Sequence, residues 1–225
     1  YRGAAVIFAR PDDALPLLRE AYRREQDPEA KLVYAHILAV LGDPTGVDTL
    51  AAKVDEYTDW DQGWNYRGMG QFGSALSPLD RYIIALGRAG DRRALPVILR
   101  KLKKLTPESE FSHHRAVALA LEMLGDPRAA APLAELLSMP GMTGYVQRTI
   151  DDAKRIDAAS PGGTNTVAPR RDALRELGLA RALFRCGDYN GVGKRILQAY
   201  TEDLRGHFAR HAKAVLDAAA SENDE

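Results

Sequence analysis

The chain has 225 residues, and its 31 basic and 31 acidic side chains give a formal net charge of zero at pH 7. Balanced charge gives no overall attraction to nucleic acid or to an anionic membrane, and no apolar run approaches the ~20 residues that span a bilayer, so we expect neither as a partner. The single cysteine, Cys186, excludes an intrachain disulfide framework and leaves the compartment open, with the cytoplasm slightly favoured.

The first predicted unit, residues 1–26, looks like a degenerate repeat. Residues 14–18 match residues 94–98 further along the chain, but Arg10-Pro11 stand where the later units have Gly-Asp. Terminal repeats are often atypical because they cap an array, and a junction with an N-terminal domain would produce the same degeneracy. Because Tyr1 is not a start methionine, we expect the sequence to be part of a longer protein.

Four tight turns then recur along the chain, each with a glycine followed by an aspartate. Glycine reaches positive φ without a Cβ penalty, and the aspartate can cap the helix that follows. A leucine stands four residues before each glycine, and apolar residues follow at matched offsets in the first three units. The fourth unit has Arg195 at one of these offsets, and we expect Leu197 to replace it. The turn glycines are Gly42, Gly90, Gly125 and Gly187, and the leucines are Leu38, Leu86, Leu121 and Leu183.

Each turn predicts a helical hairpin, and hairpins of this kind bury their apolar faces by stacking on neighbours. Proline and capping residues set the predicted starts of the hairpins. After the first unit, the predicted hairpins cover residues 27–56, 77–105, 106–139 and 168–200. A last helix over residues 204–219 covers the open end, and residues 221–225 form a frayed, disordered tail.

By these residues the chain resembles the HEAT-repeat superfamily, specifically the short bacterial HEAT-like repeats first noted in phycobilisome lyases. The resemblance implies an all-α, right-handed α-solenoid of about five HEAT-like hairpins plus a C-terminal capping helix, in a single domain over residues 1–220. Since repeat arrays offer an extended surface and little preorganised chemistry, it also implies a binding or scaffold module for a protein partner, or for a missing domain of the same polypeptide.

Two other functions stay open. The array is loosely similar to the C-terminal helical region of large bacterial FAD-dependent oxidoreductases, in which case FAD and the catalytic chemistry would belong to a missing N-terminal domain. The repeat type also leaves a lyase-like tetrapyrrole binder as an alternative. For this chain itself we expect no cofactor and no catalytic residues.

Two insertions interrupt the array. The turn glycines Gly42, Gly90, Gly125 and Gly187 are 48, 35 and 62 residues apart, and 35 residues suit a plain repeat. The excess predicts insertions at 57–76 and at 140–167, the second with a helix over Tyr145–Ile156. Both join a second helix to the next first helix, so both lie on the same edge of the array. Insertions in repeat proteins often form the binding face.

The first insertion carries the main candidate binding residues. Aromatic and arginine side chains dominate interface energetics, and glycines allow a close backbone approach. The alternative is a lid that packs these aromatic residues over the groove between the second and third units. A Gly-x-Gly-x-x-Gly pattern at 68–73 has no preceding strand and is not a dinucleotide site. The candidates are Trp60, Trp64, Tyr66, Arg67 and Phe72.

Charge is segregated next to this insertion. Residues 43–61 carry six acidic side chains and one lysine, whereas residues 88–104 carry seven basic side chains and one aspartate. Such a run is usually a solvated helix face, and the alternative is a site for phosphate or an acidic partner. The candidates Arg100, Lys101 and Lys104 are expected on the exposed side of a second helix, together with Lys103.

The histidines and the cysteine are interpreted as structural. His207 and His211 have a spacing that can hold a metal, but they share a stripe with Phe208, so we expect core histidines. His113 and His114 are adjacent on a helix and point apart. Cys186 is expected in the core. The sequence therefore predicts no metal site.

Overall fold

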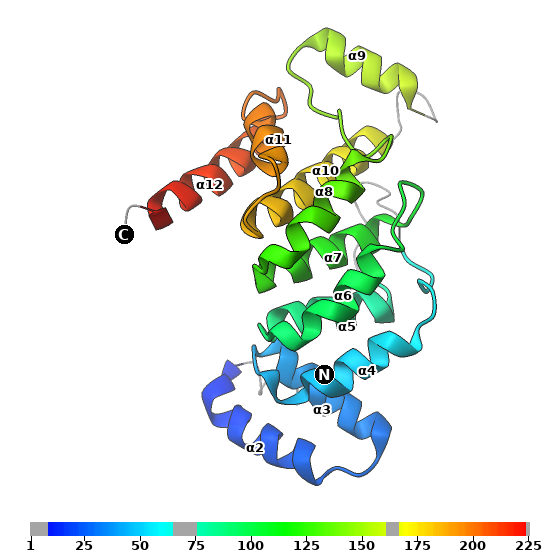
Figure 1. Cartoon of the computed structure of the whole chain (residues 1–225), viewed down its shortest axis with the longest axis vertical. Helices are drawn as coiled ribbons and strands as arrows, with labels where there is room; N and C mark the ends of the chain where they lie inside the picture. Colours follow the sequence, from blue (N-terminus) through cyan, green and yellow to red (C-terminus); the bar gives the residue numbers. More distant parts are fainter. Residues whose placement is uncertain (1–8, 65–75, 161–166, 224–225) are drawn as a thin grey trace.

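The computed structural model describes residues 9–64, 76–160 and 167–223, and every regular element in these ranges is a helix (Figure 1). In the same ranges no helix is long and apolar enough to cross a membrane. The all-α prediction is therefore confirmed. The α-helices are α2 (Pro11–Arg24), α3 (Pro28–Val40), α4 (Val47–Glu56), α5 (Pro78–Arg88), α6 (Leu95–Leu102), α7 (Phe111–Leu124), α8 (Ala130–Ser138), α9 (Ile150–Ala159), α10 (Ala168–Arg185), α11 (Val192–Tyr200) and α12 (Gly206–Asn223).

The described residues form four helical hairpins that stack along the long axis of the molecule (Figure 1). They are α3 with α4, α5 with α6, α7 with α8, and α10 with α11. α2 packs on α3 at one end, and α12 packs on α11 at the other and points away from the stack. The stacked hairpins are those of a helical solenoid.

The turns have the predicted chemistry. All four turn glycines have positive φ, with values of +81°, +67°, +56° and +90° for Gly42, Gly90, Gly125 and Gly187. In the first three turns the aspartate side chain accepts a hydrogen bond from the backbone N–H two residues further on. That bond starts a short 3-10 turn, which leads into the second helix. The 3-10 turns are η1 (Pro44–Gly46), η2 (Arg92–Ala94) and η3 (Pro127–Ala129).

The hairpins bury their apolar faces in a large cluster that runs from α3 to α10, and a second cluster lies between α10, α11 and α12. The four leucines that precede the turn glycines are completely buried, and Leu197 is buried where Arg195 points to solvent, as predicted. Backbones also approach closely between neighbouring units. A Cβ on Gly87 of α5 would lie 2.4 Å from Cα of Ala120 on α7, so only glycine fits at this contact. Cys186 is buried in the core as expected.

Three helix boundaries differ from the predictions. α7 begins at Phe111 rather than near Thr106, because residues 106–109 form a turn in which the Thr106 N–H bonds to the Ser109 hydroxyl. α9 begins at Ile150 rather than Tyr145, because a capping box between Thr149 and Asp152 starts the helix there.

At the end of the chain, α12 starts two residues later than expected and continues to Asn223. The expected tail therefore begins in a helix over residues 221–223, and residues 224–225 lie outside the described ranges.

Candidate functional site

The described start of the first insertion, residues 57–64, lies against the array. The Trp60 ring stacks on the His113 ring, with centroids 4.3 Å apart and planes 22° apart. The Trp64 backbone exchanges two hydrogen bonds with Ser112, each 3.0 Å long. These contacts favour the lid alternative for this part, while partner binding by Trp60 and Trp64 stays a prediction. The other candidates, Tyr66, Arg67 and Phe72, lie outside the described residues.

A buried polar cluster anchors this segment. His113 Nδ1 lies 2.8 Å from Asp80 Oδ1, and His113 Nε2 lies 3.1 Å from the carbonyl oxygen of Asp61. Asp80 also accepts the Ser77 backbone N–H in a capping box at the start of α5. The second ring nitrogen of His113 faces a carbonyl oxygen rather than a nucleophile of the described residues. The cluster is structural.

The basic candidates bind their own chain. Arg100 pairs with Asp55, and Lys104 pairs with Asp59. Arg93, which was not among the candidates, pairs with Asp48 in the same way, and each of the three pairs is separated by 45 residues. Lys101 donates to the Tyr57 carbonyl oxygen. It is only 3% exposed, so the prediction that it lies on an exposed face is wrong.

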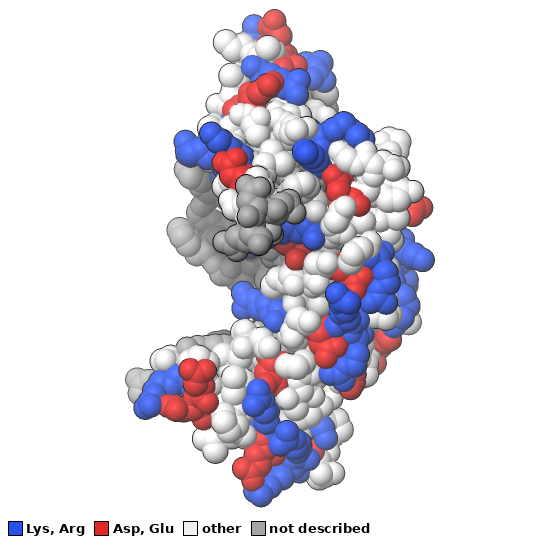
Figure 2. Space-filling model, turned by 60° about the vertical axis from the view of Figure 1, so that its left-hand side comes forward, with Lys and Arg blue, Asp and Glu red and all other residues white. Residues whose placement is uncertain are grey.

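This ladder joins α4 and the start of the insertion to the next unit, and it accounts for the segregated charge. Exposed ion pairs contribute little each, so we interpret the ladder as setting the register between units. On the face shown in Figure 2, basic and acidic side chains are interspersed.

The second insertion is also fixed to the array where it is described. Glu176 of α10 accepts the backbone N–H groups of Gly144 and Tyr145, and Asp203 accepts that of Gln147. Arg175 donates to the carbonyl oxygens of Pro107 and Gly141. The first insertion therefore meets the array at the start of α7, and the second meets it at the middle of α10 and at the segment between α11 and α12.

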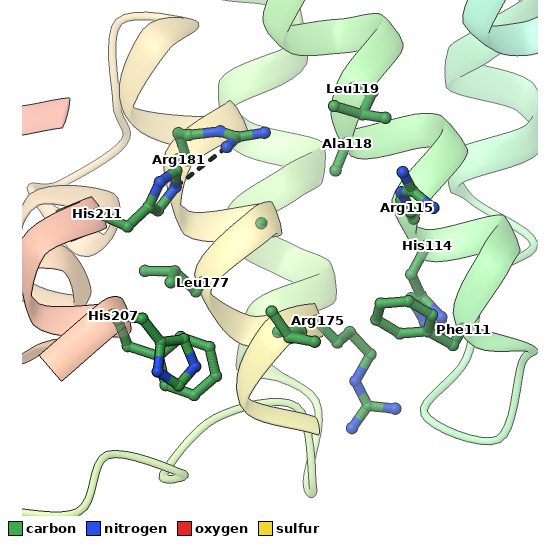
Figure 3. A pocket seen from close by; sticks show the side chains of 13 residues that line it. Phe111, His114, Arg115, Ala118, Leu119, Arg175, Leu177, Arg181, His207 and His211 are labelled. Carbon is green, nitrogen blue, oxygen red and sulfur yellow. Dashed lines mark hydrogen bonds between the residues drawn. The ribbon is translucent and has the colours of Figure 1, made fainter. Parts of the chain in front are cut away.

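A groove next to this edge is the best-formed candidate site. It lies between α7, α10 and α12, with a volume of about 480 Å³, and it is partly open to solvent. Figure 3 shows α7 and α12 on opposite sides and α10 between them. The apolar lining comes from Phe111, Ala118, Leu119, Leu174, Leu177 and Phe208, and the ionisable lining comes from His114, Arg115, Arg175, Arg181, His207 and His211.

Some polar side chains of the groove already have hydrogen-bond or ion-pair partners. Arg181 pairs with Glu122 at 2.7 Å, and its Nη1 lies 3.0 Å from Nε2 of His211 (Figure 3). An arginine can only donate, so His211 Nε2 accepts and the neutral ring carries its proton on Nδ1. Burial and the charge of Arg181 lower the pKa of His211. Burial, with a smaller effect of Arg175, lowers the pKa of His114 to about 4.

Gly178 forms part of the groove at the middle of α10. Apart from its chain neighbours and its own helix backbone, a Cβ built on it would meet no heavy atom of the described residues within 4 Å, so the space above this residue is free. Glycine inside a helix costs about 1 kcal/mol relative to alanine. Packing does not require this glycine, since nothing approaches it.

Sequence reasoning missed the groove, because it depends on the direction that α12 takes. The sequence predicted that His207 and His211 lie in the core. That prediction is wrong, because His207 is exposed and His211 is half-buried at the groove. The signal that was available is the glycine within an otherwise strong helical pattern. Within the described ranges, no three histidine, cysteine or carboxylate side chains come together as a metal site.

The stacked hairpins and the groove define a helical-repeat protein. The model of the PBS lyase HEAT-like repeat matches residues 114–138, which span most of α7, the η3 turn and α8, so this hairpin is a HEAT-like repeat as predicted. The comparison with curated proteins gives no match. A similar solved chain belongs to the complex of CpcE and CpcF of phycocyanin lyase from Nostoc sp. PCC7120. It is 23% identical, over 89% of this chain and 75% of that chain, with a TM-score of 0.42.

Proposed function

We propose that this chain is a helical-repeat binding module and that it binds a protein partner in the groove between α7, α10 and α12. The observation that carries the proposal is the free space above Gly178. A helix interior tolerates glycine at a cost in stability, and here the missing side chain leaves part of an apolar groove unfilled. Concave, mainly apolar sites with a few polar groups are typical of binding sites.

The polar groups of the groove suit binding better than catalysis. Arg175 and Arg181 already bond to carbonyl oxygens and to Glu122. His211 accepts a hydrogen bond from Arg181, so its Nε2 is not available as a general base. The alternative that this chain belongs to a larger FAD-dependent oxidoreductase stays a separate prediction, because no contact described above favours it.

An apolar fluorescent probe tests the groove directly. We expect 1-anilinonaphthalene-8-sulfonate to become fluorescent with the wild-type chain and to lose most of that signal with Gly178→Leu, whose side chain would enter the groove. Ala131→Leu is the matched control, because Ala131 is exposed on α8 and does not line the groove. Circular dichroism checks that both variants are folded. Equal fluorescence of folded Gly178→Leu and wild type would remove the groove as the binding site.

A further inference from the structure

We infer that the groove takes an acidic, amphipathic peptide segment of the partner protein, with apolar side chains over α10 and a carboxylate against Arg115. This inference rests on the proposed function and adds the chemistry of the partner. Three observations on the groove carry it: how open it is, which charges line it, and which of those charges are still without a partner.

The openness of the groove favours a peptide over a small molecule. Small-molecule sites generally bury 70–90% or more of a ligand surface, whereas this groove is partly open to solvent. A peptide segment needs to bury only one face, and an amphipathic segment lays its apolar side chains into such a groove. The leucines Leu174 and Leu177, with the open position at Gly178 between the helices, provide the surface for those side chains.

The charge of the groove is of one sign. Its ionisable lining is made of arginine and histidine, and no carboxylate is among the described residues that line it. Glu122 is not a lining residue of the groove, and its carboxylate is paired with Arg181 at 2.7 Å and with Arg185 at 3.2 Å. Because complementary charge selects partners and suppresses wrong ones, the lining favours an acidic segment over a basic one.

Arg115 is the arginine that remains available. Arg175 is buried and donates to two backbone carbonyl oxygens, and Arg181 is paired with Glu122. Arg115 lies on the α7 side of the groove, is exposed, and has no ion pair or hydrogen bond with the described part of the chain (Figure 3). A guanidinium group can hold a carboxylate with two parallel hydrogen bonds. On the opposite side, the Nδ1–H of neutral His211 is a further donor.

A selection from random short peptides displayed on phage tests this chemistry without assuming a sequence. The library is first depleted on Gly178→Leu and then selected on the wild-type chain, so the enriched peptides depend on the groove. We expect them to combine apolar residues at helical spacing with an excess of Asp and Glu. Their synthetic forms should bind Arg115→Glu about tenfold or more weakly, and replacing the critical acid by lysine should restore binding to that variant.

Arg88→Glu is the matched control, because Arg88 is an exposed arginine of α5 that does not line the groove. It should leave the affinity of the same peptides nearly unchanged. Groove-dependent peptides without excess acid, or with equal affinity for Arg115→Glu, would overturn the acidic partner while leaving the binding groove in place. If the fluorescent probe already fails to distinguish Gly178→Leu from the wild type, the groove itself is wrong and this inference is lost with it.

Discussion

His113 Nδ1 lies 2.8 Å from Asp80 Oδ1, and both side chains are buried where α7 and α5 begin. The same histidine ring stacks on Trp60, and its Nε2 faces the carbonyl oxygen of Asp61. One side chain therefore joins two neighbouring hairpins and the start of the first insertion. Asp80 keeps a lowered pKa although burial opposes it, because hydrogen bonds from His113, Ser112 and the Ser77 backbone favour its charged form.

We expect His113→Leu to lower the free energy of unfolding by about 3–5 kcal/mol, because it leaves the buried Asp80 carboxylate without its main partner. Urea unfolding at neutral pH measures the loss. His207→Leu is the control, since His207 is exposed and has no ion pair within the described part of the chain. A loss below about 1 kcal/mol for His113→Leu, the scale of an exposed pair, would show that the cluster is not a structural anchor.

The contacts of this cluster show which features of the fold can be predicted from the sequence and which cannot. Gly125 and Leu121 were predictable because a turn and a helical stripe are local patterns, with partners a few residues away. Asp80 and His113 are 33 residues apart, and their contact depends on the register between two hairpins. The direction of α12, and with it the groove, depends on the packing of Tyr200 and Phe208 in the second cluster, which no local pattern specifies. The ladder of ion pairs was visible only as segregated charge.

The turn at Gly125 gives a second prediction. Its φ is +56°, and a Cβ there would meet only the carbonyl oxygen of Arg185 at 3.9 Å. Space is therefore not limiting, and the cost of a side chain is backbone strain. We expect Gly125→Val to lower the free energy of unfolding by about 1–3 kcal/mol, measured by urea or thermal unfolding. Gly125→Asn should lose less, because asparagine tolerates this conformation better. Equal stability of the valine variant and wild type would contradict the assignment.

Trp64 separates the two interpretations of the first insertion. Its two hydrogen bonds to Ser112 are made by the backbone, so Trp64→Ala retains those bonds and removes only the side chain. If Trp64 anchors a partner, the variant should bind the natural partner about 2 kcal/mol more weakly at unchanged stability. A lower melting temperature with unchanged affinity would instead make Trp64 part of a lid. Both measurements are made on the same protein sample.

Acid should destabilise the chain before its carboxylates are protonated. The pKa of His114 falls from an ordinary 6.5 to about 4, mainly through burial, and the pKa values of His36 and His211 are lowered as well. A lowered histidine pKa means that the unfolded chain binds more protons below pH 6.5, so stability is present above that pH and is lost as the pH falls towards 4. For His114 the loss reaches about 3 kcal/mol.

Urea unfolding at several pH values between 7 and 4 measures this loss. His114→Asn is the informative variant, because an amide nitrogen can replace the donor that faces the Glu110 carbonyl oxygen without titrating. Its stability should depend much less on pH than that of the wild type. An identical pH dependence of the two proteins would show that His114 is not the group responsible.

Gly178 gives the last prediction, in which stability and binding change in opposite directions. Gly178 lies within α10, its Cβ position is free of contacts within 4 Å, and alanine is the best helix former. We therefore expect Gly178→Ala to raise the free energy of unfolding by about 0.5–1 kcal/mol. The added methyl group projects into the groove, so the affinity for the selected peptides should fall. Gly125→Ala is the contrasting control, because positive φ makes alanine unfavourable there. A Gly178→Ala chain that gains stability and binds as tightly as the wild type would show that the glycine serves no binding role.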